Sequence, residues 1–107
     1  MPAAQPFSPN TQATVSITSA VTTANVALVP KHATTVRIKN VDATNTAFVA
    51  FGISTIVATV PSGATGGSFP VGPGESIILS IGDLVTHAAA ICGAGTPIVY
   101  FTPGNGI

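Results

Sequence analysis

Charged side chains are scarce in this chain of 107 residues, which has three Lys or Arg, three Asp or Glu and a formal net charge of zero. Soluble domains usually carry charge on about a quarter of their residues, and that charge opposes association in solution. A domain of this size also leaves a large share of its surface exposed. Its exposed surface is therefore largely neutral, which favours a protein that packs against copies of itself or against a larger assembly.

Other absences exclude further classes of protein. With no net charge, the chain lacks the basic patch of a nucleic-acid-binding protein, since Arg37 and Lys39 are only two cations on one expected strand. Its single cysteine, Cys92, excludes an intrachain disulfide and lies among apolar neighbours, as a buried free thiol does. No apolar run approaches the ~18 residues of a membrane helix, and no N-terminal stretch has the features of a signal peptide. We therefore expect synthesis in the cytoplasm and no membrane contact.

Reactive side chains are also few. The three carboxylates all lie beside expected turns, where polar turn chemistry accounts for them: Asp42, Glu75 and Asp83. The two histidines, His32 and His87, are far apart in the sequence and have no ligand at metal-site spacing. The sequence therefore predicts no catalytic residue, no metal site and no cofactor, and we expect that the protein is not an enzyme. The alternative is a metal site built from both histidines and Asp83.

Hydroxyl side chains take the place of charge, because the chain contains fifteen Thr and eight Ser. Threonine is β-branched and favours strands, and its hydroxyl satisfies hydrogen bonds at polar but uncharged contacts. Eleven Gly and nine Pro supply many turns. The apolar fraction of 46% is that of a folded chain. The composition therefore predicts one all-β domain.

Alternating apolar side chains recur from residue 14 onward, with turn signals between them, as in half-buried strands. The alternating residues are Val15 and Ile17, Val26 and Leu28, Val36 and Ile38, Ile56, Ala58 and Val60, and Ile77, Leu79 and Ile81. In residues 47–52 both faces are apolar, which indicates a central strand or one that covers an interface. Residues 61–74 are rich in Gly and Pro, and we expect a long connection there with a short strand around Phe69 and Val71.

One segment near the C-terminus is compatible with two structures. Residues 87–91 and 97–101 flank residues 93–96, which predicts a hairpin with a loop of about four residues. The alternative is a short helix over residues 84–90, capped by Asp83. The hairpin is favoured because the apolar residues of both flanking segments need partners. About seven to nine strands at this spacing predict an antiparallel β-sandwich that is jelly-roll-like.

Residues 1–12 are expected to form an extended N-terminal arm, and residues 13–107 a single β-sandwich domain. Pro2, Pro6 and Pro9 forbid a helix interior or a central strand in the arm. Phe7 is its single large aromatic side chain, which we expect to dock on a neighbouring subunit. At ~3.3 Å per residue the arm reaches about 40 Å. The alternative is a frayed terminus.

Several stretches of the chain resemble small virion proteins of tailed bacteriophages, and the nearest type is the β-sandwich head decoration or cement protein. These stretches are residues 36–41, 47–52, 71–76, 87–92 and 99–106. The resemblance extends over residues 14–105 and includes no catalytic signature. It implies a jelly-roll-like sandwich that binds the outside of an icosahedral capsid as a small oligomer and bridges neighbouring capsid subunits. It transfers no family site residues to this chain.

The expected function is therefore that of a structural virion protein, a capsid decoration or cement subunit that stabilises a phage head through contacts between subunits. Its expected partners are itself, as a homo-oligomer, and the major capsid protein, and its expected location is the capsid exterior. The candidate interface residues are Phe7, Arg37, Lys39 and Phe51. One alternative is a phage collar, tail or fibre module that binds a host-surface glycan. The other is a small hydrolase or metal-dependent enzyme on a jelly roll.

Overall fold

The computed structural model describes residues 8–9, 12–28, 33–64, 66–82 and 84–105. Within these ranges the chain forms nine β-strands and no helix. The strands are β1 (Ser8–Pro9), β2 (Val15–Thr18), β3 (Ala24–Ala27), β4 (Thr35–Asn40), β5 (Ala47–Gly52), β6 (Phe69–Val71), β7 (Ser76–Ser80), β8 (His87–Cys92) and β9 (Ile98–Asn105). The all-β prediction is confirmed. No helix in the described ranges is long and apolar enough to cross a bilayer.

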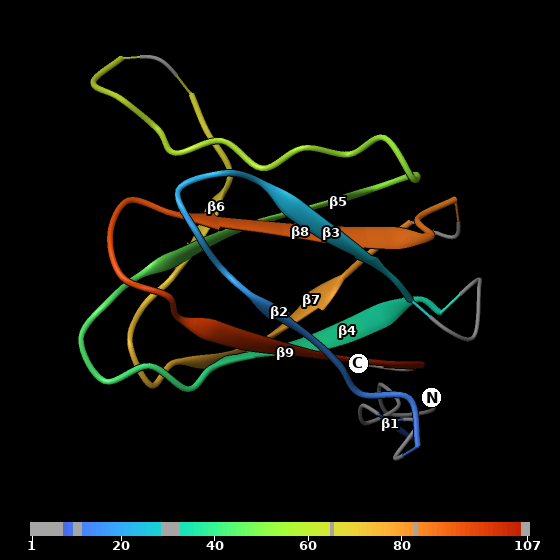
Figure 1. The fold of residues 1–107 in the computed structure, drawn as a ribbon. Helices are drawn as coiled ribbons and strands as arrows, with labels where there is room; N and C mark the ends of the chain where they lie inside the picture. The colour runs from blue at the N-terminus through green and yellow to red at the C-terminus, as the bar shows by residue number, and fades with distance from the viewer. Residues whose placement is uncertain (1–7, 10–11, 29–32, 65, 83, 106–107) are drawn as a thin grey trace.

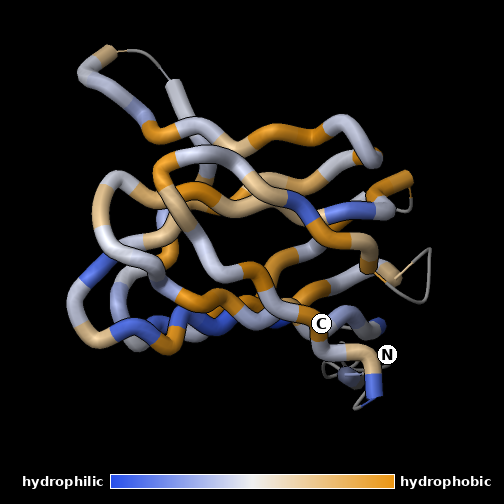
Figure 2. Tube along the Cα trace, viewed as in Figure 1, coloured by the Kyte–Doolittle hydropathy of each residue, from blue (hydrophilic) through white to orange (hydrophobic). Residues whose placement is uncertain are grey.

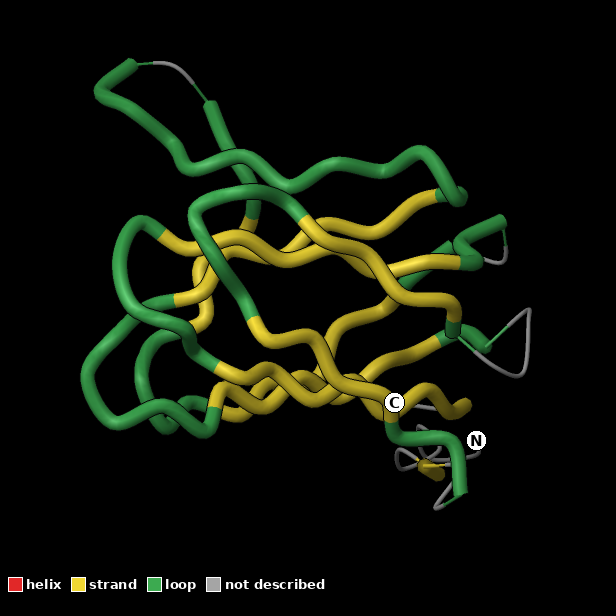
Figure 3. The backbone as a smooth tube through the Cα atoms, viewed as in Figure 1, coloured by secondary structure: helices red, strands yellow, loops and turns green. Residues whose placement is uncertain are grey.

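The strands form two antiparallel sheets that lie one above the other as layers (Figures 1 and 3). One sheet has the order β1-β9-β4-β7, with β2 also paired along β9, and the other has the order β3-β8-β5-β6. The antiparallel pairs β2–β9, β3–β8, β4–β7 and β5–β6 show that the chain folds back on itself about the β5–β6 connection. The resulting ribbon then rolls up, so that β9 pairs with β4 and β8 with β5. This arrangement is a jelly roll, and the predicted sandwich is confirmed.

The core lies between the two sheets and follows the alternation seen in the sequence. In β4, Val36 and Ile38 are fully buried whereas Arg37 between them is exposed, because successive strand side chains point to opposite faces. Phe101 of β9 is the largest fully buried side chain. Its ring meets Phe51 edge-on, with centroids 5.9 Å apart and an interplanar angle of 86°. Burial of a side chain of this size stabilises the fold by about 1.5–3 kcal/mol.

A strap, which we define as residues 53–60, crosses the outer face of the four-stranded sheet and runs above β3, β5 and β8 in Figure 1. Asn25 of β3 donates its side-chain amide to the strap carbonyls of Ser54 and Ile56, at 3.0 and 3.4 Å. The strap's Ala58 N–H donates in turn to Thr23 Oγ1 at 2.8 Å. Ala89 points toward this outer face and yet is fully buried. Small side chains on β5 and β8 therefore let a third layer approach the sheet closely.

Two of the expectations from the sequence are wrong. Residues 87–91 and 97–101 do not form a hairpin, because β8 pairs with β3 and β5 in one sheet while β9 pairs with β2 and β4 in the other. The connection between them is an arch from one layer to the next. Residues 56–60 are not a strand, although their alternating burial is as expected, because they rest on a sheet face instead of extending a sheet edge. The short strand around Phe69 is confirmed as β6.

The expected N-terminal arm lies largely outside the described residues, as do Phe7, His32 and Asp83. Within it, β1 pairs with β9, with Ser8 opposite Asn105 and Pro9 opposite Gly104. A strand that contains proline is confined to a sheet edge, which fits the position of β1 in the strand order. The boundary between arm and domain stays a prediction.

Candidate interaction surface

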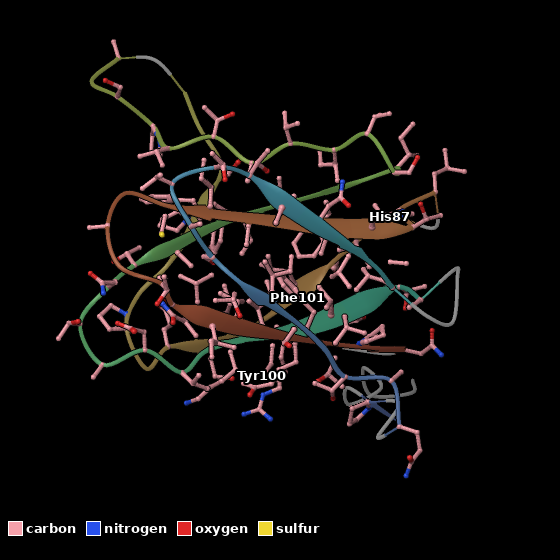
Figure 4. The ribbon with its side chains drawn as sticks, viewed as in Figure 1. His87, Tyr100 and Phe101 are labelled. Carbon is pink, nitrogen blue, oxygen red and sulfur yellow. The ribbon has the colours of Figure 1, made fainter. Side chains whose placement is uncertain are left out.

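Two cations and an aromatic ring meet on the outer face of the five-stranded sheet. Lys39 of β4 lies directly opposite Tyr100 of β9, and Arg37 lies opposite Ile78 of β7. Figure 4 shows that Tyr100 points away from the sandwich, while its neighbour Phe101 points between the sheets. Tyr100 is 39% exposed and Ile78 41%. We call the surface formed by Arg37, Lys39, Ile78 and Tyr100 the cationic face.

Each cation is held in place by a neutral partner. Arg37 donates from Nε to Ser76 Oγ at 2.9 Å, and Lys39 donates from Nζ to the Gly74 carbonyl at 3.0 Å. Among the described residues neither cation forms an ion pair, and the terminal Nη groups of Arg37 make no hydrogen bond. The guanidinium therefore has its planar fork of donors available for a carboxylate of a partner.

Hydroxyl groups surround the cations. Thr14, the residue before β2, and Thr102 of β9 form a hydrogen bond between their hydroxyl groups, with the oxygens 2.8 Å apart. Further exposed hydroxyls on the same sheet belong to Ser16, Thr18, Ser76 and Ser80. In Figure 2 several of the most hydrophilic stretches run along this sheet, whereas the strap is mostly white and orange. The hydrogen-bond partners of the two cations are thus polar but uncharged, and the carboxylate residue Glu75 lies between these partners in the chain.

The two described carboxylates both accept hydrogen bonds from backbone N–H groups of their own loops. Asp42 accepts the backbone N–H groups of Thr44 and Asn45 at 2.9 and 2.7 Å. These hydrogen bonds favour the ionised form and lower the pKa of the Asp42 carboxyl from its ordinary value. Glu75 accepts the Gly72 N–H at 2.7 Å. Both carboxylates shape turns between strands, as expected from the sequence.

Large apolar side chains are exposed at several places on the described surface. They are Val21, Val41, Ile53, Val57, Phe69, Ile78, Leu84 and Tyr100. Leu84, at 80%, is the most exposed of them, and Ile53 and Val57 of the strap are each exposed by 59%. Residues 43–74, which include the strap, contain no charged side chain at all. One sheet thus presents the cationic face, and the opposite layer presents a neutral surface with apolar side chains.

The expected interface residues differ from one another in their location: two lie on the outer face of a sheet and one packs against the core. Arg37 and Lys39 lie side by side on the cationic face, as their alternation predicts. Phe51 packs against Phe101 and the core, so packing accounts for it, and a role in an interface stays a prediction. Sequence reasoning missed Tyr100, although buried Val99 and Phe101 on either side signal an outward-pointing ring.

The remaining reactive side chains are separated. His87 and Cys92 occupy opposite ends of β8 and differ in parity, so they point to opposite faces of the sheet at a separation of about 16 Å. Cys92 is buried and donates from Sγ to the Gly95 carbonyl at 3.3 Å, and burial raises the pKa of its thiol. The His87 ring contacts the Thr86 hydroxyl at 2.8 Å through Nδ1. In the described part of the chain no three His, Cys, Asp or Glu residues gather as a metal site would require.

A scan against models of protein families and a search of curated proteins give no match to this chain. The function is therefore inferred from the fold, the cationic face and the neutral opposite layer.

Proposed function

We propose that this protein is a structural subunit of a virus particle, a decoration or cement subunit that binds the exterior of a bacteriophage head. The observation that supports this proposal best is the distribution of charge. Among the described residues only four side chains carry a formal charge: the cations Arg37 and Lys39 on one sheet face, and the carboxylates Asp42 and Glu75 in turns; the rest of the surface is neutral and has exposed apolar side chains. A freely diffusing domain gains solubility from charge that this chain lacks.

The fold supports the proposal without deciding it. Jelly rolls build viral capsid proteins, but they also build lectins and enzymes. The neutral surface favours the structural role, because Thr, Ser and Ala contacts lose little hydration when they are buried. The cationic face would orient the subunit on its partner, since Arg37 and Lys39 attract a surface that presents carboxylates.

Weak individual contacts suffice for such a subunit. A head offers many equivalent sites, and a subunit that touches both a neighbouring copy and the capsid binds through several contacts at once. Effective concentration then raises the overall affinity well above that of each contact. By bridging neighbouring capsid subunits, such contacts resist the outward pressure of packaged DNA.

A second candidate function is a collar, tail or fibre module that binds a host-surface glycan. Tyr100 favours it, because an exposed ring among hydroxyl groups provides a stacking surface for a sugar. Among the described residues, Tyr100 is the one aromatic ring on the cationic face, so the structural role is the better supported.

Gold-labelled antibodies raised against the full chain, applied to purified particles of the virus that encodes it, test both functions by electron microscopy. We expect label over the heads. Label confined to tails or fibres, together with binding to a glycan array, would establish the second function instead. Particles without label would overturn both.

A further inference from the structure

Strand β7 leaves one edge of the five-stranded sheet unpaired. On its inner side the Glu75 carbonyl accepts the Asn40 N–H at 3.0 Å, and the Ile81 N–H donates to the Thr34 carbonyl at 2.9 Å. Odd-numbered residues therefore direct their backbone groups toward β4. By the alternation of an antiparallel ladder, Ser76, Ile78 and Ser80 direct theirs away from it. No strand in the described ranges pairs with that edge.

Several other edges of the two sheets have features that oppose pairing with another chain. At one edge of the four-stranded sheet, β6 has only three residues and contains Pro70. At its other edge, β3 has only four residues, and the side chains of Asn25 and of the preceding Thr23 are hydrogen-bonded to the strap. In the five-stranded sheet, β1 contains Pro9, and β2, which forms the rest of that edge, has only four residues and no proline. Short strands, prolines and covering segments are the usual protection of sheet edges.

β7 has none of these protections. Residues 76–82 contain neither a proline nor a charged residue, and Ile78 at the centre of the strand is 41% exposed. The sequence of β7, Ser-Ile-Ile-Leu-Ser, is also nearly the same in both directions. An antiparallel strand pair with a two-fold axis places each residue opposite its mirror position, so β7 is complementary to itself.

We propose that two copies of this chain pair through their β7 strands, antiparallel, with the two-fold axis at Ile78. Ser76 then lies opposite Ser80 of the partner subunit, Ile77 opposite Leu79 of the partner subunit, and the two Ile78 side chains meet. The unpaired backbone groups form about six hydrogen bonds across the axis. The two five-stranded sheets become one continuous sheet.

Side chains and charges are compatible with this dimer. Apolar pairs form on both faces of the new ladder, and such cross-strand pairs stabilise sheets. Arg37 is one strand inward from Ile78, so the two Arg37 side chains lie about 14 Å apart across the axis. That distance exceeds the Debye length of ~8 Å at physiological ionic strength, and their repulsion is screened. The dimer goes beyond the proposed function, because it forms in the isolated protein whether or not the chain binds a head.

Disulfide trapping in the full chain tests the pairing. In a Cys92→Ala background, Ile78→Cys places two thiols on the axis with Cα atoms about 5.5 Å apart, within the range of a disulfide. Tyr100→Cys in the same background is the matched control, because Tyr100 is equally exposed on the same sheet face but lies two strands away from the edge. We expect the Ile78→Cys dimer to form at least tenfold faster on mild oxidation.

A second variant separates pairing from folding. Ile78→Lys places two like charges at the axis, and we expect its mass by light scattering to fall to half that of the unaltered chain with unchanged circular dichroism. Equal rates of disulfide formation in the two cysteine variants would overturn the proposal. So would a monomeric mass of the unaltered chain across a hundredfold dilution, or a mass that Ile78→Lys leaves unchanged.

Discussion

At the scale of single residues, Asn40 joins several loops although its side chain is completely buried. Its Nδ2 donates to the carbonyls of Asn45 and Val71, at 2.9 and 3.0 Å, and its Oδ1 accepts the Asp42 N–H at 3.0 Å. The amide thereby connects the end of β4, the β4–β5 loop and β6. A buried amide satisfied in this way positions a loop without leaving a polar group unpaired.

We predict that Asn40→Ala lowers the free energy of unfolding by about 2–4 kcal/mol, because it leaves the Val71 carbonyl and its neighbours without partners in the interior. Thr44→Ala in the same loop is the control. Its exposed hydroxyl makes only a 3.3 Å contact with Asp42, so its loss costs less than about 0.5 kcal/mol. Urea denaturation at neutral pH measures both, and equal stabilities of the two variants would contradict the role assigned to Asn40.

At the scale of strands, the sequence was informative wherever one face of a strand is buried. The alternation around Val36 and Ile38 predicted β4, its buried face and the outward position of Arg37 and Lys39. The meeting of Lys39 with Tyr100 was not predictable in this way. It depends on the pairing of β4 with β9, and strand order is decided by packing across the whole chain.

Local sequence patterns did not predict strand pairing where a loop of the same length can connect strands in more than one way. A loop of the length of residues 93–96 suits a hairpin, but it also suits an arch between two layers. The arch forms here because β8 fits between β3 and β5, where Ala88 and Ala90 face the core and Ala89 leaves room for the strap. The strap shows a similar ambiguity. Its alternating sequence predicts which side chains are buried, but it does not predict whether the backbone forms hydrogen bonds with a neighbouring strand.

We predict that Asn25→Ala releases the strap without unfolding the sandwich. The variant loses the hydrogen bonds to the carbonyls of Ser54 and Ile56, which costs about 1 kcal/mol of local stability. Limited proteolysis with mass spectrometry then shows faster cleavage within residues 53–68. Thr22→Ala, in the exposed turn before β3, is the control and cleaves as the unaltered chain does. Unchanged cleavage in Asn25→Ala would show that apolar contacts alone hold the strap.

At the scale of the whole molecule, the two outer layers differ in charge. The described cations lie on the five-stranded sheet, and the strap and the strands beneath it carry none. A molecule with such a difference has a preferred orientation toward a charged partner, because only one side attracts it. Apolar contacts between copies are then left to the neutral layer and the sheet edges.

The last prediction uses this difference to identify the side that binds the head. We expect Arg37→Gln/Lys39→Gln to weaken co-sedimentation with purified heads at least tenfold at low salt, because it removes the charges that attract carboxylates of the partner. Added salt should weaken binding of the unaltered chain for the same reason. Val57→Glu/Thr59→Glu changes the net charge by the same two units on the exposed strap, and we expect it to sediment as the unaltered chain does. The opposite pattern, with binding lost only in the strap variant, would assign attachment to the neutral layer.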